Sequence, residues 1–138
     1  MKAEREVLLK NRPDENQRLH QFVEEFCQAH HLSAKVAFSL GVALEEHLTN
    51  IISYAYDDER EHLIRVQLCL TNNELRIEID DDGRSFNPVE HPEPNTSVPL
   101  DQKPIGGLGI HMIRKSMDGM EYRRQNGKNI LVLKKRIE

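Results

Sequence analysis

The five residues Glu46-His47-Leu48-Thr49-Asn50 place a carboxylate and a carboxamide one helical turn apart in a segment that is otherwise apolar. At about 3.6 residues per turn, its apolar residues fall on one stripe, which comprises Leu44, Leu48, Ile51, Ile52 and Ala55. The opposite side gathers Glu46, Thr49, Asn50 and Ser53. A solvated helix face usually carries long charged residues of both signs, whereas short polar groups of this kind line pockets. The pattern therefore predicts a helix with one face against a core and the other against a site.

Glu46 and Asn50 are the candidates for the chemistry of that site. An amide oxygen is a suitable ligand for Mg²⁺, and a carboxylate one turn away can polarise an attacking hydroxyl. The spacing therefore suits a site for a metal and a nucleotide. An exposed helix face without a ligand is the simpler explanation of this pair when it is taken alone.

A second informative segment runs from Asp80 to Pro88 and directly follows the apolar alternation of residues 75–79. Because side chains alternate between the faces of a strand, Asp81 continues the inward-facing row of Leu75, Ile77 and Ile79. A buried carboxylate is costly unless it is hydrogen-bonded, and the amino group of adenine would satisfy it. Gly83 would let the backbone approach a ligand closely. The alternative is an acidic exit from a strand into a loop.

The third segment, residues 105–113, is a glycine-rich turn that leads into apolar residues at helical spacing. Such a turn offers backbone N–H groups and the positive end of a helix dipole to phosphates. The alternative is that the glycines only allow the chain to pack closely and bind no phosphate. The Gly-Lys-Ser/Thr ending of a P-loop is absent from the sequence, and the turn does not follow a strand in a βαβ unit, which argues against a dinucleotide fingerprint.

Taken in this order, the three segments resemble the signature of the GHKL (Bergerat-fold) ATPases, and most closely their anti-sigma-factor serine kinase branch. That signature reads E-x-x-x-N, then D-x-G-x-x-F-[DN]-P, then G-G-x-G-[IL]-x-x-[IL]. The matching residues are Glu46 and Asn50, then Asp81, Gly83, Phe86, Asn87 and Pro88, then Gly106, Gly107, Leu108, Gly109, Ile110 and Ile113. The resemblance extends from about residue 5 to the end of the chain, and the combination is far more specific than any one motif.

The resemblance implies a role for each site residue and implies ATP and Mg²⁺ as cofactors. Asn50 would coordinate the metal, and Asp81 would accept from the adenine amino group, with Gly83 giving the ring room. Gly107 and Gly109 would contact phosphates through their backbones. Glu46 would be the catalytic base for a serine hydroxyl of a partner protein. Phosphoryl transfer needs mainly positioning and charge neutralisation, so this short set is chemically sufficient.

The resemblance also implies partners. We expect the chain to phosphorylate a STAS-type anti-sigma factor antagonist and to sequester a sigma factor or similar regulator, as a homodimer in the cytoplasm. A nucleotide-dependent binding module without kinase activity is one alternative, although such a module has no need of Glu46. A stand-alone histidine-kinase-like ATPase domain is another, weakened because no helical hairpin with a phosphoacceptor histidine precedes the domain in this sequence.

One position of this chain departs from the pattern of the family that it resembles. Its members commonly carry Gly-Thr in the last strand, and the threonine bonds to the adenine-reading aspartate. Here Asn129 follows Lys128 at that place. An amide can donate the same hydrogen bond, so the adenine site is expected to survive the change.

Lys103 is the one obvious cationic phosphate sensor in residues 84–105, the proline-rich segment expected to form the nucleotide lid.

The remaining patterns predict the fold, an α+β (α/β) two-layer sandwich with a mixed, mostly antiparallel sheet covered on one face by three helices. Strands are expected at residues 5–10, at 64–70, up to residue 81, and on both sides of the hairpin turn Asn126-Gly127. Helices are expected from Pro13, over 34–56 after an N-cap at Ser33, and over 108–117.

Composition limits the possible functions. The 138 residues suffice for one domain, expected to be the whole of residues 1–138, and with no tryptophan and 5% aromatic residues its core must be mainly aliphatic. A net charge of −4 argues against nonspecific nucleic-acid binding. The absence of a long apolar run and of a signal peptide's apolar segment predicts neither membrane span nor export. Cys27 and Cys69 are expected to be buried thiols.

Overall fold

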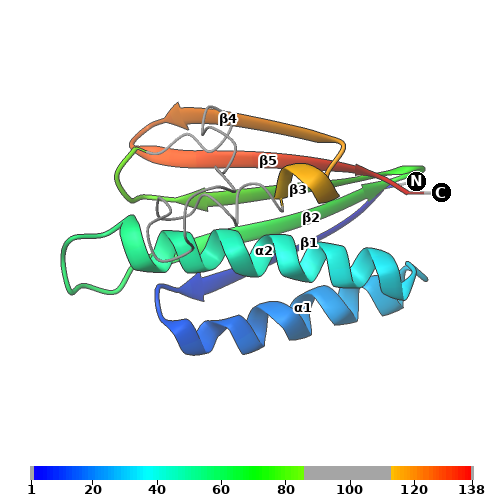
Figure 1. Ribbon diagram of the computed structural model, residues 1–138, viewed down its shortest axis with the longest axis horizontal. Helices are drawn as coiled ribbons and strands as arrows, with labels where there is room; N and C mark the ends of the chain where they lie inside the picture. Colours follow the sequence, from blue (N-terminus) through cyan, green and yellow to red (C-terminus); the bar gives the residue numbers. More distant parts are fainter. Residues whose placement is uncertain (1, 86–112, 138) are drawn as a thin grey trace, which may run out of the picture.

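The computed structural model describes residues 2–85 and 113–137, which form one sheet with two long helices against one of its faces (Figure 1). The strands are β1 (Lys2–Lys10), β2 (Leu63–Thr71), β3 (Glu74–Asp81), β4 (Gly119–Gln125) and β5 (Lys128–Arg136). The helices are a short 3-10 helix (Pro13–Glu15), α1 (Asn16–Ala29) and α2 (Ala34–Tyr54). Residues 113–116 form a further helical turn. The α+β two-layer architecture is therefore confirmed.

The sheet has the strand order β1-β2-β3-β5-β4, and each pairing between the described strands is antiparallel. We expected a mixed, mostly antiparallel sheet; the antiparallel character is confirmed, and no parallel pair occurs among the described strands. Short turns explain the pairs β2–β3 and β4–β5, because a parallel pair would need a long crossover connection. The order also places β5 between β3 and β4, so the end of β3 faces the start of β5.

The Asn126-Gly127 turn joins β4 and β5 as predicted. Both residues have positive φ, 53° at Asn126 and 75° at Gly127. A two-residue hairpin turn of this type requires that conformation at both positions, which is why the Asn-Gly pair favours it. The two-residue turn sets the register of the hairpin, in which Arg124 lies opposite Asn129.

The core lies between the helices and the sheet and is almost wholly aliphatic. Leu40, Leu44, Leu48 and Ile51 of α2 are at most 5% exposed. They belong to one cluster with the inward-facing residues of the strands, such as Ile64 of β2 and Ile77 of β3. Each such side chain stabilises the fold by about 1.5–3 kcal/mol relative to exposure. The predicted stripe of α2 is confirmed, except that Ile52 and Ala55 at its end are only partly buried.

The element boundaries differ from the sequence predictions by a few residues. β1 begins at Lys2 rather than at residue 5, because its ladder with β2 continues to the pair Lys2–Thr71. α2 ends at Tyr54, two residues early, although its N-cap is as predicted: the Ser33 hydroxyl accepts from the Val36 N–H at 3.1 Å. Pro13 opens a 3-10 turn that leads into α1. Of the helix predicted over 108–117, residues 113–116 are helical and 108–112 lie outside the described residues.

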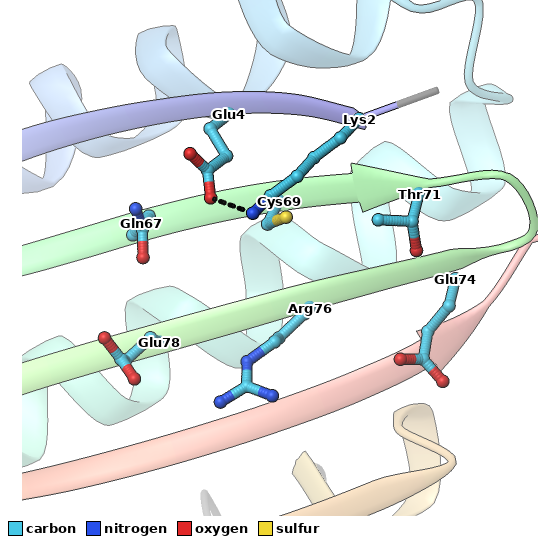
Figure 2. Close-up of a pocket in the computed structure, with 8 residues that line it drawn as sticks. All are labelled: Lys2, Glu4, Gln67, Cys69, Thr71, Glu74, Arg76 and Glu78. Carbon is cyan, nitrogen blue, oxygen red and sulfur yellow. Dashed lines mark ion pairs between the residues drawn. The ribbon is translucent and has the colours of Figure 1, made fainter.

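The sheet face that points away from the helices is strongly charged (Figure 2). A hollow of about 350 Å³ on this face is lined by Lys2, Glu4, Gln67, Cys69, Thr71, Glu74, Arg76 and Glu78. Cys69 therefore corrects one prediction, since its thiol is only partly buried, whereas Cys27 is buried as expected. Alternation along β2 is the reason, because Ile64, Val66 and Leu68 take the inward positions.

None of the described helices is long and apolar enough to cross a membrane.

Candidate functional site

The turn that follows β3 lies against the C-terminal end of α2, at one end of the molecule (Figure 1). The Arg84 backbone N–H donates to the Ala55 carbonyl at 2.9 Å. A Cβ added to Gly83 would lie 2.5 Å from the Ala55 Cβ and 2.7 Å from its carbonyl oxygen. Packing on the helix end therefore requires a glycine here. That Gly83 also gives a ligand room remains a prediction.

Asp81 ends the inward-facing row of β3 and is 3% exposed, so its predicted burial is confirmed. Its Oδ2 accepts from the Gly83 N–H and from the Asn129 side-chain nitrogen, each at 3.0 Å. Burial raises the pKa of this carboxyl, and the bonds from Asn129 and Gly83 act in the opposite direction. Within residues 2–85 and 113–137, Oδ1 has no hydrogen bond, so one oxygen of a fixed carboxylate is left to accept from a ligand.

Asn129, 7% exposed, joins Asp81 to strand β4. Its nitrogen donates to Asp81 and, at 2.8 Å, to the Arg84 carbonyl. Its oxygen accepts from the Tyr122 hydroxyl at 2.6 Å and from the Arg124 guanidinium at 3.0 Å. The hydrogen bond from an amide at position 129 to Asp81 is thus present as predicted.

Tyr122 and Arg124 were not among the residues predicted for the site. The signal for them lies in the hairpin, since a two-residue turn at Asn126-Gly127 pairs Arg124 with Asn129. Tyr122 lies two residues before Arg124 and so shares its face of the strand. Arg124 also donates to the Gly83 carbonyl at 2.7 Å, which ties β4 to the turn after β3.

Glu46 and Asn50 lie in α2 as predicted, and both are half-buried. The Asn50 side-chain nitrogen is buried and has no hydrogen-bond partner among the described residues. A buried polar group of this kind costs about 1–3 kcal/mol when it stays unsatisfied. The fold therefore leaves this donor of Asn50 unsatisfied, which suits a residue that donates to a ligand. The roles of Glu46 and Asn50 remain predictions.

His47, between these two residues in sequence, is turned further toward the core than either of them. It is 5% exposed and continues the apolar stripe. Burial lowers its pKa to about 4, so the ring is neutral at pH 7. Its spacing from Leu40 and Leu44 places it on the buried face, a signal that the sequence contains. His47 therefore belongs to the core and not to the site.

A cluster of side chains around His62 links the segment after α2 to the turn after β3. The His62 ring lies between Asp58, with its Nε2 2.7 Å from an Asp58 oxygen, and Asp82, 3.2 Å from Nδ1. It also stacks on Tyr56, with ring centroids 4.0 Å apart. The hydrogen bond to Asp58, and then that to Asp82, raises the pKa of His62. Sequence reasoning did not single out His62, because its partners come from two separate turns.

Several predicted site elements lie outside the described residues. They are Gly106, Gly107 and Gly109, Phe86 to Pro88, Lys103, and all of the expected lid 84–105 except Arg84 and Ser85. Their roles stay predictions. Asp81, Gly83 and Asn129 are brought together by the fold, and the end of α2, the helix that carries Glu46 and Asn50, contacts the same turn.

Comparison with known families defines the class of this protein. The model of the histidine kinase-like ATPase domain matches residues 9–135, so the chain belongs to that family. The fold agrees: the RsbU and RsbW domains of Rv1364c from Mycobacterium tuberculosis superpose with a TM-score of 0.65 at 10% identity, over 97% of this chain and 32% of that one.

Similar proteins narrow the class to one branch. The chain is 32% identical to the serine/threonine-protein kinase BtrW of Bordetella bronchiseptica over 101 residues, 73% of this chain and 71% of that protein. It is 28% identical to the serine-protein kinase RsbW of Bacillus velezensis over 99 residues, 69% of this chain and 62% of that relative. Within the histidine kinase-like ATPases, the chain therefore belongs to the anti-sigma-factor kinase branch.

Proposed function

We propose that this chain is an ATP-dependent serine/threonine protein kinase that phosphorylates a STAS-type anti-sigma factor antagonist. In the same proposal, it is a single cytoplasmic domain that forms a homodimer and holds a sigma factor or similar regulator when the antagonist is absent. The observation that carries the proposal is the fixed carboxylate of Asp81, buried with one oxygen engaged by the fold and the other available. Such an acceptor suits the amino group of adenine.

The nucleotide would be held by residues from three parts of the chain. Asp81 would accept from the base, next to a turn in which Gly83 is packed on α2. Gly107 and Gly109 would donate their backbone N–H groups to phosphates. Asn50 would hold Mg²⁺ through its amide oxygen, and its nitrogen, which has no hydrogen bond to the described residues, would be left to donate to the nucleotide. Bound Mg²⁺ would supply charge neutralisation for the phosphates.

Glu46 would act on the acceptor protein rather than on the nucleotide. It lies one helical turn before Asn50, about 6 Å along the axis, on the same side of α2. From there its carboxylate can accept the proton of a serine hydroxyl without being needed to hold the metal. No residue of the chain has to form a covalent intermediate.

The direct test is phosphate transfer to a serine. The purified chain would be incubated with radiolabelled ATP, Mg²⁺ and the STAS-type protein encoded nearest to it, with that protein's acceptor serine changed to alanine as the control. We expect label on the serine protein and none on the alanine variant. A chain that binds ATP but labels no such protein would instead support the nucleotide-dependent binding module.

A further inference from the structure

We propose that Tyr122 and Arg124 are positioning residues for base recognition, which orient the Asn129 amide and thereby hold Asp81 as an acceptor for the amino group of an adenine-type purine. This inference rests on the proposed function, because it concerns the same nucleotide site. It adds two residues of β4 and explains why an asparagine can occupy position 129.

The first step concerns which way the Asn129 amide faces. Its oxygen lies 2.6 Å from the Tyr122 hydroxyl and 3.0 Å from the Arg124 guanidinium, and both groups donate. A guanidinium has no acceptor. If the amide were turned over, its NH₂ group would face the Arg124 cation, so Arg124 selects one orientation and the Tyr122 hydroxyl adds a hydrogen bond to it.

The second step follows on the other side of the same amide. In the selected orientation the Asn129 nitrogen donates to Asp81 Oδ2 at 3.0 Å and to the Arg84 carbonyl at 2.8 Å. Both partners are acceptors, so a turned amide would set oxygen against oxygen twice. All four hydrogen-bonding positions of the amide are therefore used in one orientation, and three of them are opposed in the other, since only the Tyr122 hydroxyl can also accept.

The third step connects this amide to the base. Asp81 Oδ2 is occupied by Asn129 and by the Gly83 N–H, whereas Oδ1 accepts no hydrogen bond from the part of the chain that the structure describes. Without Tyr122 or Arg124, the amide would be freer to turn its oxygen toward Asp81 and displace the carboxylate. The acceptor presented to the base would then be lost, while the rest of the nucleotide contacts would be unchanged.

The experiment compares two nucleotides in the same protein. Calorimetric titration in the presence of Mg²⁺ would measure the affinity for ATP and for purine riboside triphosphate, which has hydrogen in place of the 6-amino group. Wild type should prefer ATP. Tyr122→Phe should weaken ATP binding by about two- to tenfold and leave the other nucleotide unaffected. Arg124→Met also loses the bond to the Gly83 carbonyl, so it should weaken both nucleotides, and ATP by about two- to tenfold more. The preference for ATP should therefore fall by the same factor.

Two controls separate positioning from general damage. Arg123→Met changes the neighbouring arginine, which lies on the other face of β4 and pairs with Glu78 at 3.6 Å, so the preference should stay as in wild type. In an Asn129→Ala background, Tyr122→Phe should no longer change the preference, because the amide through which it acts is gone.

Each outcome is decisive. Equal weakening of both nucleotides, or an unchanged preference in both variants, would overturn the inference while leaving ATP binding intact. A wild type that binds both nucleotides equally would overturn it too, because Asp81 would then not read the amino group. A wild type that binds neither nucleotide would overturn the proposed function itself.

Discussion

At the scale of single residues, the two oxygens of Asp81 have different tasks. One oxygen accepts from Gly83 and Asn129 and so belongs to the fold, and the other accepts no bond from residues 2–85 or 113–137. This division means that a substitution can preserve the first task and abolish the second.

Asp81→Asn should make that separation. The amide oxygen can still accept from Gly83 and Asn129, but the NH₂ group would replace the available oxygen and set a donor against the adenine amino group. An unsatisfied pair of this kind costs about 1–3 kcal/mol, on the order of tenfold or more in ATP affinity. Calorimetric titration with ATP and Mg²⁺ is the measurement.

Asp80→Asn is the matched control for this change. Asp80 is the preceding residue, lies on the other face of β3 and bonds to Arg65 at 3.1 Å. It should leave ATP affinity unchanged. Equal affinity in wild type and Asp81→Asn would remove Asp81 from the site.

Glu46→Gln should separate binding from chemistry. It keeps the size of the side chain but removes the basic carboxylate, and a positioned base contributes about 10²–10⁴-fold in rate. Phosphorylation of the acceptor serine should fall by about that factor, with ATP affinity within a few-fold of wild type. Asn50→Ala should impair both, through loss of the metal ligand. Rate assays and titrations on both variants would show this.

The control for Glu46 is its neighbour Glu45, which turns toward α1 and lies 3.3 Å from His20. Glu45→Gln should leave the phosphorylation rate unchanged. If Glu46→Gln retained the full rate, Glu46 would have a structural role and the base would have to be sought elsewhere.

At the scale of elements, the site depends on the packing contact between the turn after β3 and the end of α2. The structure explains Gly83 through this contact, because Ala55 occupies the space that a Cβ would need.

Gly83→Ala should force the turn away from α2 and break the bond from the Arg84 N–H to the Ala55 carbonyl. We expect a loss of about 1–3 kcal/mol in the free energy of unfolding, measured by urea denaturation. Gly119→Ala is the control, since the nearest atom to its added Cβ would be 3.5 Å away, an ordinary contact. Equal stabilities for the two variants would mean that the turn after β3 can move away from α2 without loss of free energy of unfolding.

The elements themselves were largely predictable, and the reasons differ from one to the next. The α2 stripe, the β2 and β3 alternation and the Asn126-Gly127 turn are local patterns, so each predicted its element correctly. The N-terminal residues of β1 were missed because Lys2 and Glu4 show no apolar alternation; only pairing with β2 makes them a strand. The Tyr122–Asn129 contact follows from the hairpin register that the Asn126-Gly127 turn sets, a signal that the prediction did not use. The His62–Asp82 contact depends on the shape of two turns, which local patterns do not specify.

At the scale of the whole molecule, the buried His47 makes the fold sensitive to acid. Its pKa is lowered to about 4 in the folded state from an ordinary value of 6.5. The unfolded chain therefore binds a proton first as the pH falls, and stability is lost between pH 6.5 and about 4. The loss is on the order of 3 kcal/mol.

His47→Leu should remove this part of the acid sensitivity, since leucine fills a similar volume and carries no proton. Urea denaturation at pH 7 and pH 4.5 would give the change in the free energy of unfolding between these two pH values for wild type and for His47→Leu. His31→Asn, at an exposed position whose φ of 57° asparagine tolerates, is the control and should keep the wild-type dependence. The same pH dependence in His47→Leu and wild type would show that His47 is not its source.

The position of β5 inside the sheet has a consequence for how the molecule is made. Asp81 and Asn129 are separated by 48 residues, and β3 has β5 as its neighbour on one side. Until β5 is synthesised, the side of β3 that does not pair with β2 is an open edge with unpaired backbone groups, a template for pairing with another chain. A nascent chain on the ribosome therefore completes neither the central pairing of the sheet nor the contact between Asp81 and Asn129 before β5 emerges, and until then the open side of β3 is exposed to aggregation.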